Sequence, residues 1–135
     1  MRKLTAMSLA IAIGLVPFQT TAAAKFDGSV PLLCAPIEVV ECDAGGKCYD
    51  GTAESVNIPQ FIKINFKERI LTDAEEGGRT APIKHFERDN GRLIMHGGQG
   101  GRGWTAVISE ETGKMSATIS EERVGFILFG ACTPL

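Results

Sequence analysis

Hydrophobic and polar residues alternate over several short stretches of the chain. Ile62, Ile64 and Phe66 alternate with polar neighbours, and a period of two recurs at 104–109 and 115–119. Because successive side chains of a strand point to opposite faces, this pattern predicts strands with one buried and one solvated face. Four more stretches are apolar or β-branched enough to predict strands: 32–41, 80–88, 92–96 and 124–129.

Short turn sequences separate these predicted strands, and no stretch has a helical period. Asp89-Asn90-Gly91 contains the Asn-Gly pair typical of hairpins, and Glu111-Thr112-Gly113 fits a three-residue turn. Strands joined in this way pair as an antiparallel meander. The sequence therefore predicts an all-β fold of about seven or eight short strands, arranged as a small up-and-down barrel or a strongly curved sheet, since either protects the edges.

The amino-terminal segment has the pattern of a secretory signal peptide. Arg2 and Lys3 precede the uncharged apolar run Leu4–Val16, and Ala22 and Ala24 fit the small-residue positions of a cleavage site. The run is shorter than the ~18–20 residues that span a bilayer, so a membrane anchor is not favoured.

Two segments follow from this interpretation: a signal peptide over residues 1–24 and a single disulfide-bearing β domain over residues 25–135. The formal net charge of −2 becomes −4 when the basic residues at positions 2 and 3 are removed. A mildly acidic chain without a basic stripe is a poor candidate for nucleic acid. No membrane span is expected after cleavage, and the expected location is the periplasm or the exterior of the cell.

Cysteine usage agrees with export. The chain has four cysteines, Cys34, Cys42, Cys48 and Cys132, and an even number in an exported chain predicts two disulfides. The spacings do not match zinc ligand pairs. We expect Cys42–Cys48 to close a turn at 43–47. Cys34–Cys132 would join the first strand to the last, which are neighbours in a closed barrel.

The glycine-rich run 98–103 reads G-Q-G-G-R-G, which matches the G-x-G-x-x-G pattern of dinucleotide-binding proteins. That motif needs a helix after it, whereas a strand is predicted here, so a connection between two strands is favoured. In a weaker alternative, backbone amides and Arg102 hold an anion. Trp104 has two interpretations, a core residue or a ligand-contacting aromatic at the mouth of a barrel.

The two histidines bracket the predicted Asn90-Gly91 hairpin. If that turn has two residues, Asp89 pairs with Arg92 and His85 lies directly opposite His96. Opposed Cβ atoms are ~4.5–5.5 Å apart, which is close enough for both imidazoles to bind one copper or zinc ion. A three-residue loop would break this pairing, and two polar surface residues are the alternative to a metal site.

Three segments resemble small exported proteobacterial proteins of unknown function. The segments are 55–66 (S-V-N-I-P-Q-F-I-K-I-N-F), the step Arg102-Gly103-Trp104, and 124–135, which ends G-A-C-T-P-L. The resemblance covers most of the chain after residue 24. It implies export into a bacterial periplasm, and it implies no activity, substrate or site residue.

No catalytic signature is present, since the serines lie at polar-face or turn positions and no G-x-S-x-G occurs. We therefore expect a non-enzymatic periplasmic binding or interaction module, with no cofactor and with a small apolar ligand or a protein as its partner. Two alternatives remain, an enzyme of unassigned chemistry and a weak metal-binding protein that uses His85 and His96.

Overall fold

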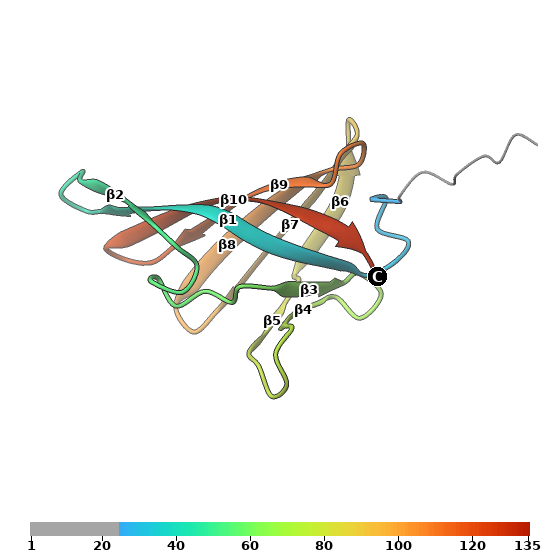
Figure 1. The fold of residues 1–135 in the computed structure, drawn as a ribbon, viewed down its shortest axis with the longest axis horizontal. Coiled ribbons are helices and arrows are strands. Elements are labelled where there is room, and N and C mark those ends of the chain that lie inside the picture. Colours follow the sequence, from blue (N-terminus) through green and yellow to red (C-terminus); the bar gives the residue numbers. More distant parts are fainter. Residues whose placement is uncertain (1–24) are drawn as a thin grey trace, which may run out of the picture.

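The computed structural model describes residues 25–135, which form one strongly curled antiparallel sheet with no helix among them (Figure 1). The all-β prediction is confirmed, and the strands exceed the expected seven or eight. The expected signal peptide, residues 1–24, lies outside the described residues. The ten strands are β1 (Leu32–Asp43), β2 (Cys48–Gly51), β3 (Ile62–Asn65), β4 (Ile70–Asp73), β5 (Thr80–Pro82), β6 (His85–Asp89), β7 (Arg92–Gln99), β8 (Arg102–Ser109), β9 (Lys114–Ser120) and β10 (Val124–Pro134).

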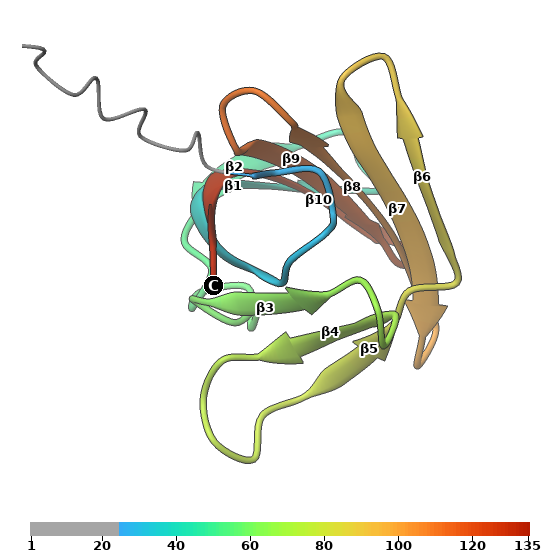
Figure 2. The same ribbon diagram turned by 90° about the vertical axis from the view of Figure 1, so that its right-hand side faces the viewer.

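The first and last strands lie side by side in the middle of the sheet. Its order is β5-β4-β3-β1-β10-β9-β8-β7-β6, and β2 pairs with β1 beside the β3 contact. The β1–β10 ladder runs from Leu32 opposite Pro134 to Asp43 opposite Val124. Figure 2 shows how the sheet curls, so that β3, β4 and β5 lie across an interior from β8 and β9. Of the two predicted arrangements, the strongly curved sheet is the one observed.

The two edge strands, β5 and β6, are consecutive in the chain. Between them, the N–H of Ile83 donates to the carbonyl of Arg69 (2.9 Å), and the N–H of Lys84 donates to the carbonyl of His96 (3.0 Å). Two adjacent residues thus bond to opposite ends of the sheet, which requires the sheet to curl. The strand predicted over 80–88 is therefore divided into two strands at this crossing.

A β-bulge bends β1 where it wraps around the interior. The register with β10 shifts between Pro36 and Glu38, which leaves Ile37 as the extra residue, with 68% of its surface exposed. Gly130 lies opposite this bulge, and a Cβ there would be 2.1 Å from the carbonyl oxygen of Ala35. A glycine is therefore needed for the two strands to approach at the bend.

The core consists of two clusters. The larger cluster contains Leu32, Leu93, Met95 and Ile108, all fully buried, and Phe26 packs into it from the segment before β1. The smaller cluster contains five buried residues: Val39, Ala53, Ile58, Phe126 and Leu128. The interior is thus packed in two places.

Both predicted disulfides are confirmed. Cys34 bonds to Cys132 from directly opposite positions on β1 and β10, and Cys42 bonds to Cys48 across the β1–β2 pair. Every cysteine among the described residues is therefore oxidised. This usage fits an oxidising compartment outside the cytoplasm.

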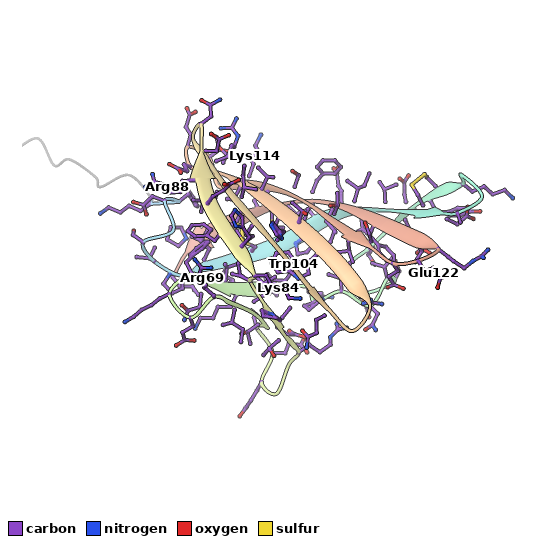
Figure 3. The ribbon with its side chains drawn as sticks, turned by 180° about the vertical axis from the view of Figure 1, so that it is seen from behind. Arg69, Lys84, Arg88, Trp104, Lys114 and Glu122 are labelled. Atoms are coloured by element: carbon purple, nitrogen blue, oxygen red, sulfur yellow. A yellow bond between two sulfur atoms is a disulfide. The ribbon has the colours of Figure 1, made fainter. Side chains whose placement is uncertain are left out.

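The edge strand β6 is short and charged. Figure 3 shows Lys84 and Arg88 near opposite ends of it. The guanidinium of Arg88 donates from Nε and Nη2 to the two carboxylate oxygens of Glu110, each at 2.8 Å. Charged side chains on a short edge oppose pairing with another chain.

Candidate functional site

A pocket of about 600 Å³ opens inside the curl, between the two core clusters. Its walls come from β3, β4 and β5 on one side and from β8, β9 and β10 on the other, with the segment before β3 at one margin. This volume lies in the range of about 300–1,000 Å³ that is usual for small-molecule sites. The pocket is therefore the candidate site.

Most of the pocket wall is apolar. Ile58, Leu71, Met115, Leu128 and the ring of Trp104 line it. These side chains come from separate strands and loops, and the curl brings them around one space. An apolar ligand would gain about 25 cal/mol for each Å² of apolar surface that it removes from water here.

Gly97 makes room for the tryptophan. It lies opposite Trp104 in the β7–β8 ladder, and a Cβ there would be 2.7 Å from Cζ2 of the indole. The same Cβ would be 2.4 Å from the carbonyl oxygen of Pro82 at the end of β5. Gly97 therefore allows both the indole and the edge strand β5 to pack closely against β7.

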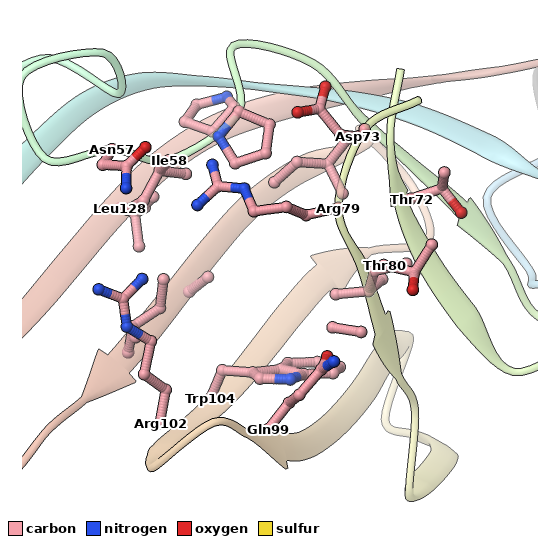
Figure 4. Close-up of a pocket in the computed structure, with 18 of the residues that line it drawn as sticks. Asn57, Ile58, Thr72, Asp73, Arg79, Thr80, Gln99, Arg102, Trp104 and Leu128 are labelled. Atoms are coloured by element: carbon pink, nitrogen blue, oxygen red, sulfur yellow. The ribbon is translucent and has the colours of Figure 1, made fainter. Parts of the chain in front are cut away.

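The indole nitrogen of Trp104 is buried and has no hydrogen-bond partner among the described residues. Tryptophan N–H groups usually find a partner when they are buried. Figure 4 shows the indole along the pocket wall, and Gln99 of β7 lines the same pocket. Trp104 packs against the larger core cluster, as the core interpretation expects, and it also lines the pocket, so ligand contact stays a prediction.

Two guanidinium groups project into the pocket, as Figure 4 shows. Arg79 comes from the loop between β4 and β5, and Arg102 is the first residue of β8. Nε of Arg102 lies 2.5 Å from a carboxylate oxygen of Glu121. Arg79 forms no ion pair with a described residue.

Asp73 is the one carboxylate among the described lining residues. Its Oδ1 accepts a hydrogen bond of 3.1 Å from the N–H of Glu75, within its own loop. The carboxylate therefore helps to form the β4–β5 loop that carries Arg79.

The glycine-rich run forms a hairpin, as favoured from the sequence. Gly98 pairs with Gly103 and Gln99 with Arg102, so Gly100-Gly101 is a two-residue turn with φ values of +60° and +82°. A strand follows the turn, and the arrangement that holds a dinucleotide pyrophosphate is not formed. The turn instead places Arg102 at the margin of the pocket.

The predicted pairing of the histidines is confirmed. His85 lies opposite His96 in the β6–β7 ladder, and their rings stack with centroids 5.0 Å apart and an interplanar angle of 21°. Both residues are exposed, and neither lines the pocket. Nε2 of His85 lies 3.3 Å from a carboxylate oxygen of Glu87.

The metal hypothesis for this pair stays a prediction. Within residues 25–135, no group of three or more His, Cys, Asp or Glu side chains is arranged to hold a metal ion. Two imidazoles alone make a weak site. A zinc titration of the His96→Ala variant beside the unchanged protein tests the hypothesis.

Sequence reasoning singled out Arg102 and Trp104 but missed Arg79. Arg79 ends an acidic loop, D-A-E-E-G-G-R, and nothing in that composition indicates that its side chain turns inward. Only the packing of the β4–β5 hairpin across from β8 brings it to the pocket. A pattern limited to one strand or loop carries no signal for such a contact.

Comparisons with known proteins found no match to this chain. The chain matches no family model, no curated protein and no solved structure. Residues 25–135 hold no helix with the length and hydropathy needed to cross a membrane.

Proposed function

We propose that this protein is an exported, non-enzymatic binding module that holds a small, largely apolar molecule inside its curled sheet. The observation that carries the proposal is the pocket of about 600 Å³ between the two core clusters. Cores of small domains are normally packed without large voids, so an open interior of this size favours a ligand. The proposed location is the periplasm or the exterior of the cell, in keeping with the two disulfides.

The composition of the pocket supports binding over catalysis. Its described lining includes one carboxylate and no histidine, cysteine or lysine. Carboxylate, histidine, cysteine and lysine side chains are among those that most often act as nucleophiles or as general acids and bases. The polar groups that do line it, two arginines, amides and threonine side chains, are suited to orienting a ligand.

The test uses the neutral apolar dye N-phenyl-1-naphthylamine and the protein's single tryptophan. Because Trp104 lines the pocket, its emission should change as the dye binds, and the dye should become fluorescent. Ala117→Phe fills the pocket from β9, and we expect it to weaken dye binding by about ten-fold or more.

Ser116→Phe is the matched control, because residue 116 is the chain neighbour of 117 and points to the opposite face of β9. It should bind the dye as the unchanged protein does. Circular dichroism checks that both variants are folded. Absence of dye binding in the unchanged protein, or equal binding by a folded Ala117→Phe variant, contradicts the proposal and favours a protein partner on the outer face.

A further inference from the structure

The charge of the pocket differs from that of the chain. The protein has a formal net charge of −2, yet two guanidinium groups project into the pocket, whose wall is otherwise mostly apolar. Arg79 is exposed and the Arg102 side chain is 41% exposed, so water reaches both guanidinium groups. Two arginines from separate elements thus present to the pocket donors that a ligand could take over from water.

Both arginines keep donors for a ligand. The terminal nitrogens of Arg102 form no hydrogen bond with a described residue, since Glu121 lies against Nε. The whole side chain of Arg79 is without an ion pair among the described residues. The planar fork of a guanidinium matches the two oxygens of a carboxylate, and such charge-assisted pairs are among the stronger hydrogen bonds.

Nearby carboxylates limit the charge that the site can accept. Glu121 offsets part of the charge of Arg102, and Asp73 lines the same pocket as Arg79. The two guanidinium groups and the two carboxylates sum to a formal charge of zero, so an anion would be held by directed guanidinium hydrogen bonds and not by excess positive charge. A ligand with one negative charge is favoured over a dianion such as a phosphate monoester, which would be repelled by both carboxylates.

The remaining surface calls for an apolar body. Ile58, Leu71, Leu128 and Trp104 line the same space as the two arginines. A small polar anion would leave this apolar surface in contact with water, and a hydrocarbon would make no use of the guanidinium donors.

We infer that the ligand is an amphipathic monocarboxylate, whose carboxylate is held by Arg79 and Arg102 and whose apolar body lies along Trp104 and the aliphatic wall. This inference rests on the proposed function, since it names the class of ligand that the same pocket takes. From the sequence alone, Arg102 and backbone amides were a weaker candidate for holding an anion. The inference adds a second cation, Arg79, and an apolar surface to that hypothesis.

The experiment compares three probes with the same ten-carbon chain at neutral pH: decanoate, decan-1-ol and decyl phosphate. Each displaces N-phenyl-1-naphthylamine from the unchanged protein. We expect decanoate to displace the dye at a concentration about ten-fold lower than decan-1-ol, because one charge-assisted hydrogen bond contributes about that much affinity. We expect decyl phosphate to bind no more tightly than decanoate. Sodium chloride at high concentration should reduce this preference.

Three variants locate the carboxylate. Arg79→Gln and Arg102→Gln should each remove most of the preference for decanoate while binding the neutral dye normally. Arg92→Gln is the control, because Arg92 is an exposed arginine that does not line the pocket, and it should keep the full preference.

The outcomes separate the two proposals. Equal displacement by decanoate and decan-1-ol, or a preference that survives in both pocket variants, overturns the monocarboxylate and leaves the pocket standing. Tighter binding of decyl phosphate overturns the limit to one charge. Failure of the neutral dye to bind at all overturns the proposed function itself.

Discussion

At the scale of single residues, glycines decide how closely other groups approach. Gly113, in the turn between β8 and β9, has φ +69°, and a Cβ there would lie 2.5 Å from Cε1 of Phe26. Phe26 is only 8% exposed and packs into the larger core cluster. This one glycine thus lets the segment before β1 close an end of the curled sheet.

Gly113→Ala should therefore destabilise the protein more than an alanine at a positive φ usually does. The backbone conformation costs about 1–2 kcal/mol, and overpacking against Phe26 and the carbonyl oxygen of Cys132, 2.8 Å from the Cβ position, adds about 1–3 kcal/mol. Gly46→Ala is the matched control, since Gly46 has φ +80° and no atom within 4 Å of its Cβ position. Urea denaturation of both variants measures the difference. Equal losses would show that Phe26 and the Cys132 carbonyl move aside at little energetic cost.

At the scale of elements, an ion pair joins the edge strand β6 to the turn after β8. Two hydrogen bonds from Arg88 hold the pKa of Glu110 below its usual value of 4.5. Because the folded pKa is lowered, the stabilisation is present above about pH 4.5 and is lost as the pH falls through the folded pKa. Both side chains lie at the surface, so the effect is modest.

Glu110→Gln should thus lower the free energy of unfolding at pH 7, and this loss should shrink toward pH 3 as the carboxyl of the unchanged protein takes up a proton. Thermal denaturation at the two pH values measures this. Glu111→Gln, at an exposed neighbour with no ion pair among residues 25–135, should show no such pH dependence. A Glu110→Gln effect of equal size at both pH values would mean that the charge is not responsible.

Strands with a two-residue period and longer apolar or β-branched runs were predicted from sequence, whereas the four-residue strands β2 and β4 were missed. β2 has three exposed residues and one partly buried residue, and β4 is partly buried throughout, so neither alternates. The division between β5 and β6 was also missed, because it depends on hydrogen bonds from Ile83 and Lys84 to two distant strands. Local patterns identify a strand when its two faces differ or when its apolar run is long, and neither holds for β2 or β4.

The same limit applies to the site. The histidine pairing could be predicted because a two-residue turn fixes the register of its hairpin. The pocket could not be predicted, since Arg79 and Arg102 line one space only through the curl of the whole sheet, which no single hairpin determines. Trp104 and Arg102 were singled out as individual residues. The space that separates them from the β4–β5 hairpin was not predicted.

At the scale of the whole molecule, the two disulfides close loops of very different length. Cys34 and Cys132 are 98 residues apart in sequence, whereas Cys42 and Cys48 are 6 apart. In the loop-entropy model, the long loop contributes about 4.7 kcal/mol and the short one about half of that. The bridge between β1 and β10 is therefore expected to be the dominant crosslink.

A Cys34→Ala/Cys132→Ala double variant should lose about twice as much free energy of unfolding as a Cys42→Ala/Cys48→Ala double variant. Replacing both members of a bridge avoids leaving a free thiol. Guanidinium denaturation of both variants under the same conditions measures the losses. Equal losses would mean that strand pairing already restrains the unfolded chain around the longer loop.

The neighbouring positions of β1 and β10 also bear on the order of events during synthesis. β1 is the first strand to be made among the described residues, yet the longest ladder it forms awaits the last. Contacts between distant parts of a chain form late and slowly. A chain exported as proposed would therefore stay unfolded while it is threaded through a membrane, and it would acquire its native structure only after β10 has emerged into the compartment that oxidises its thiols.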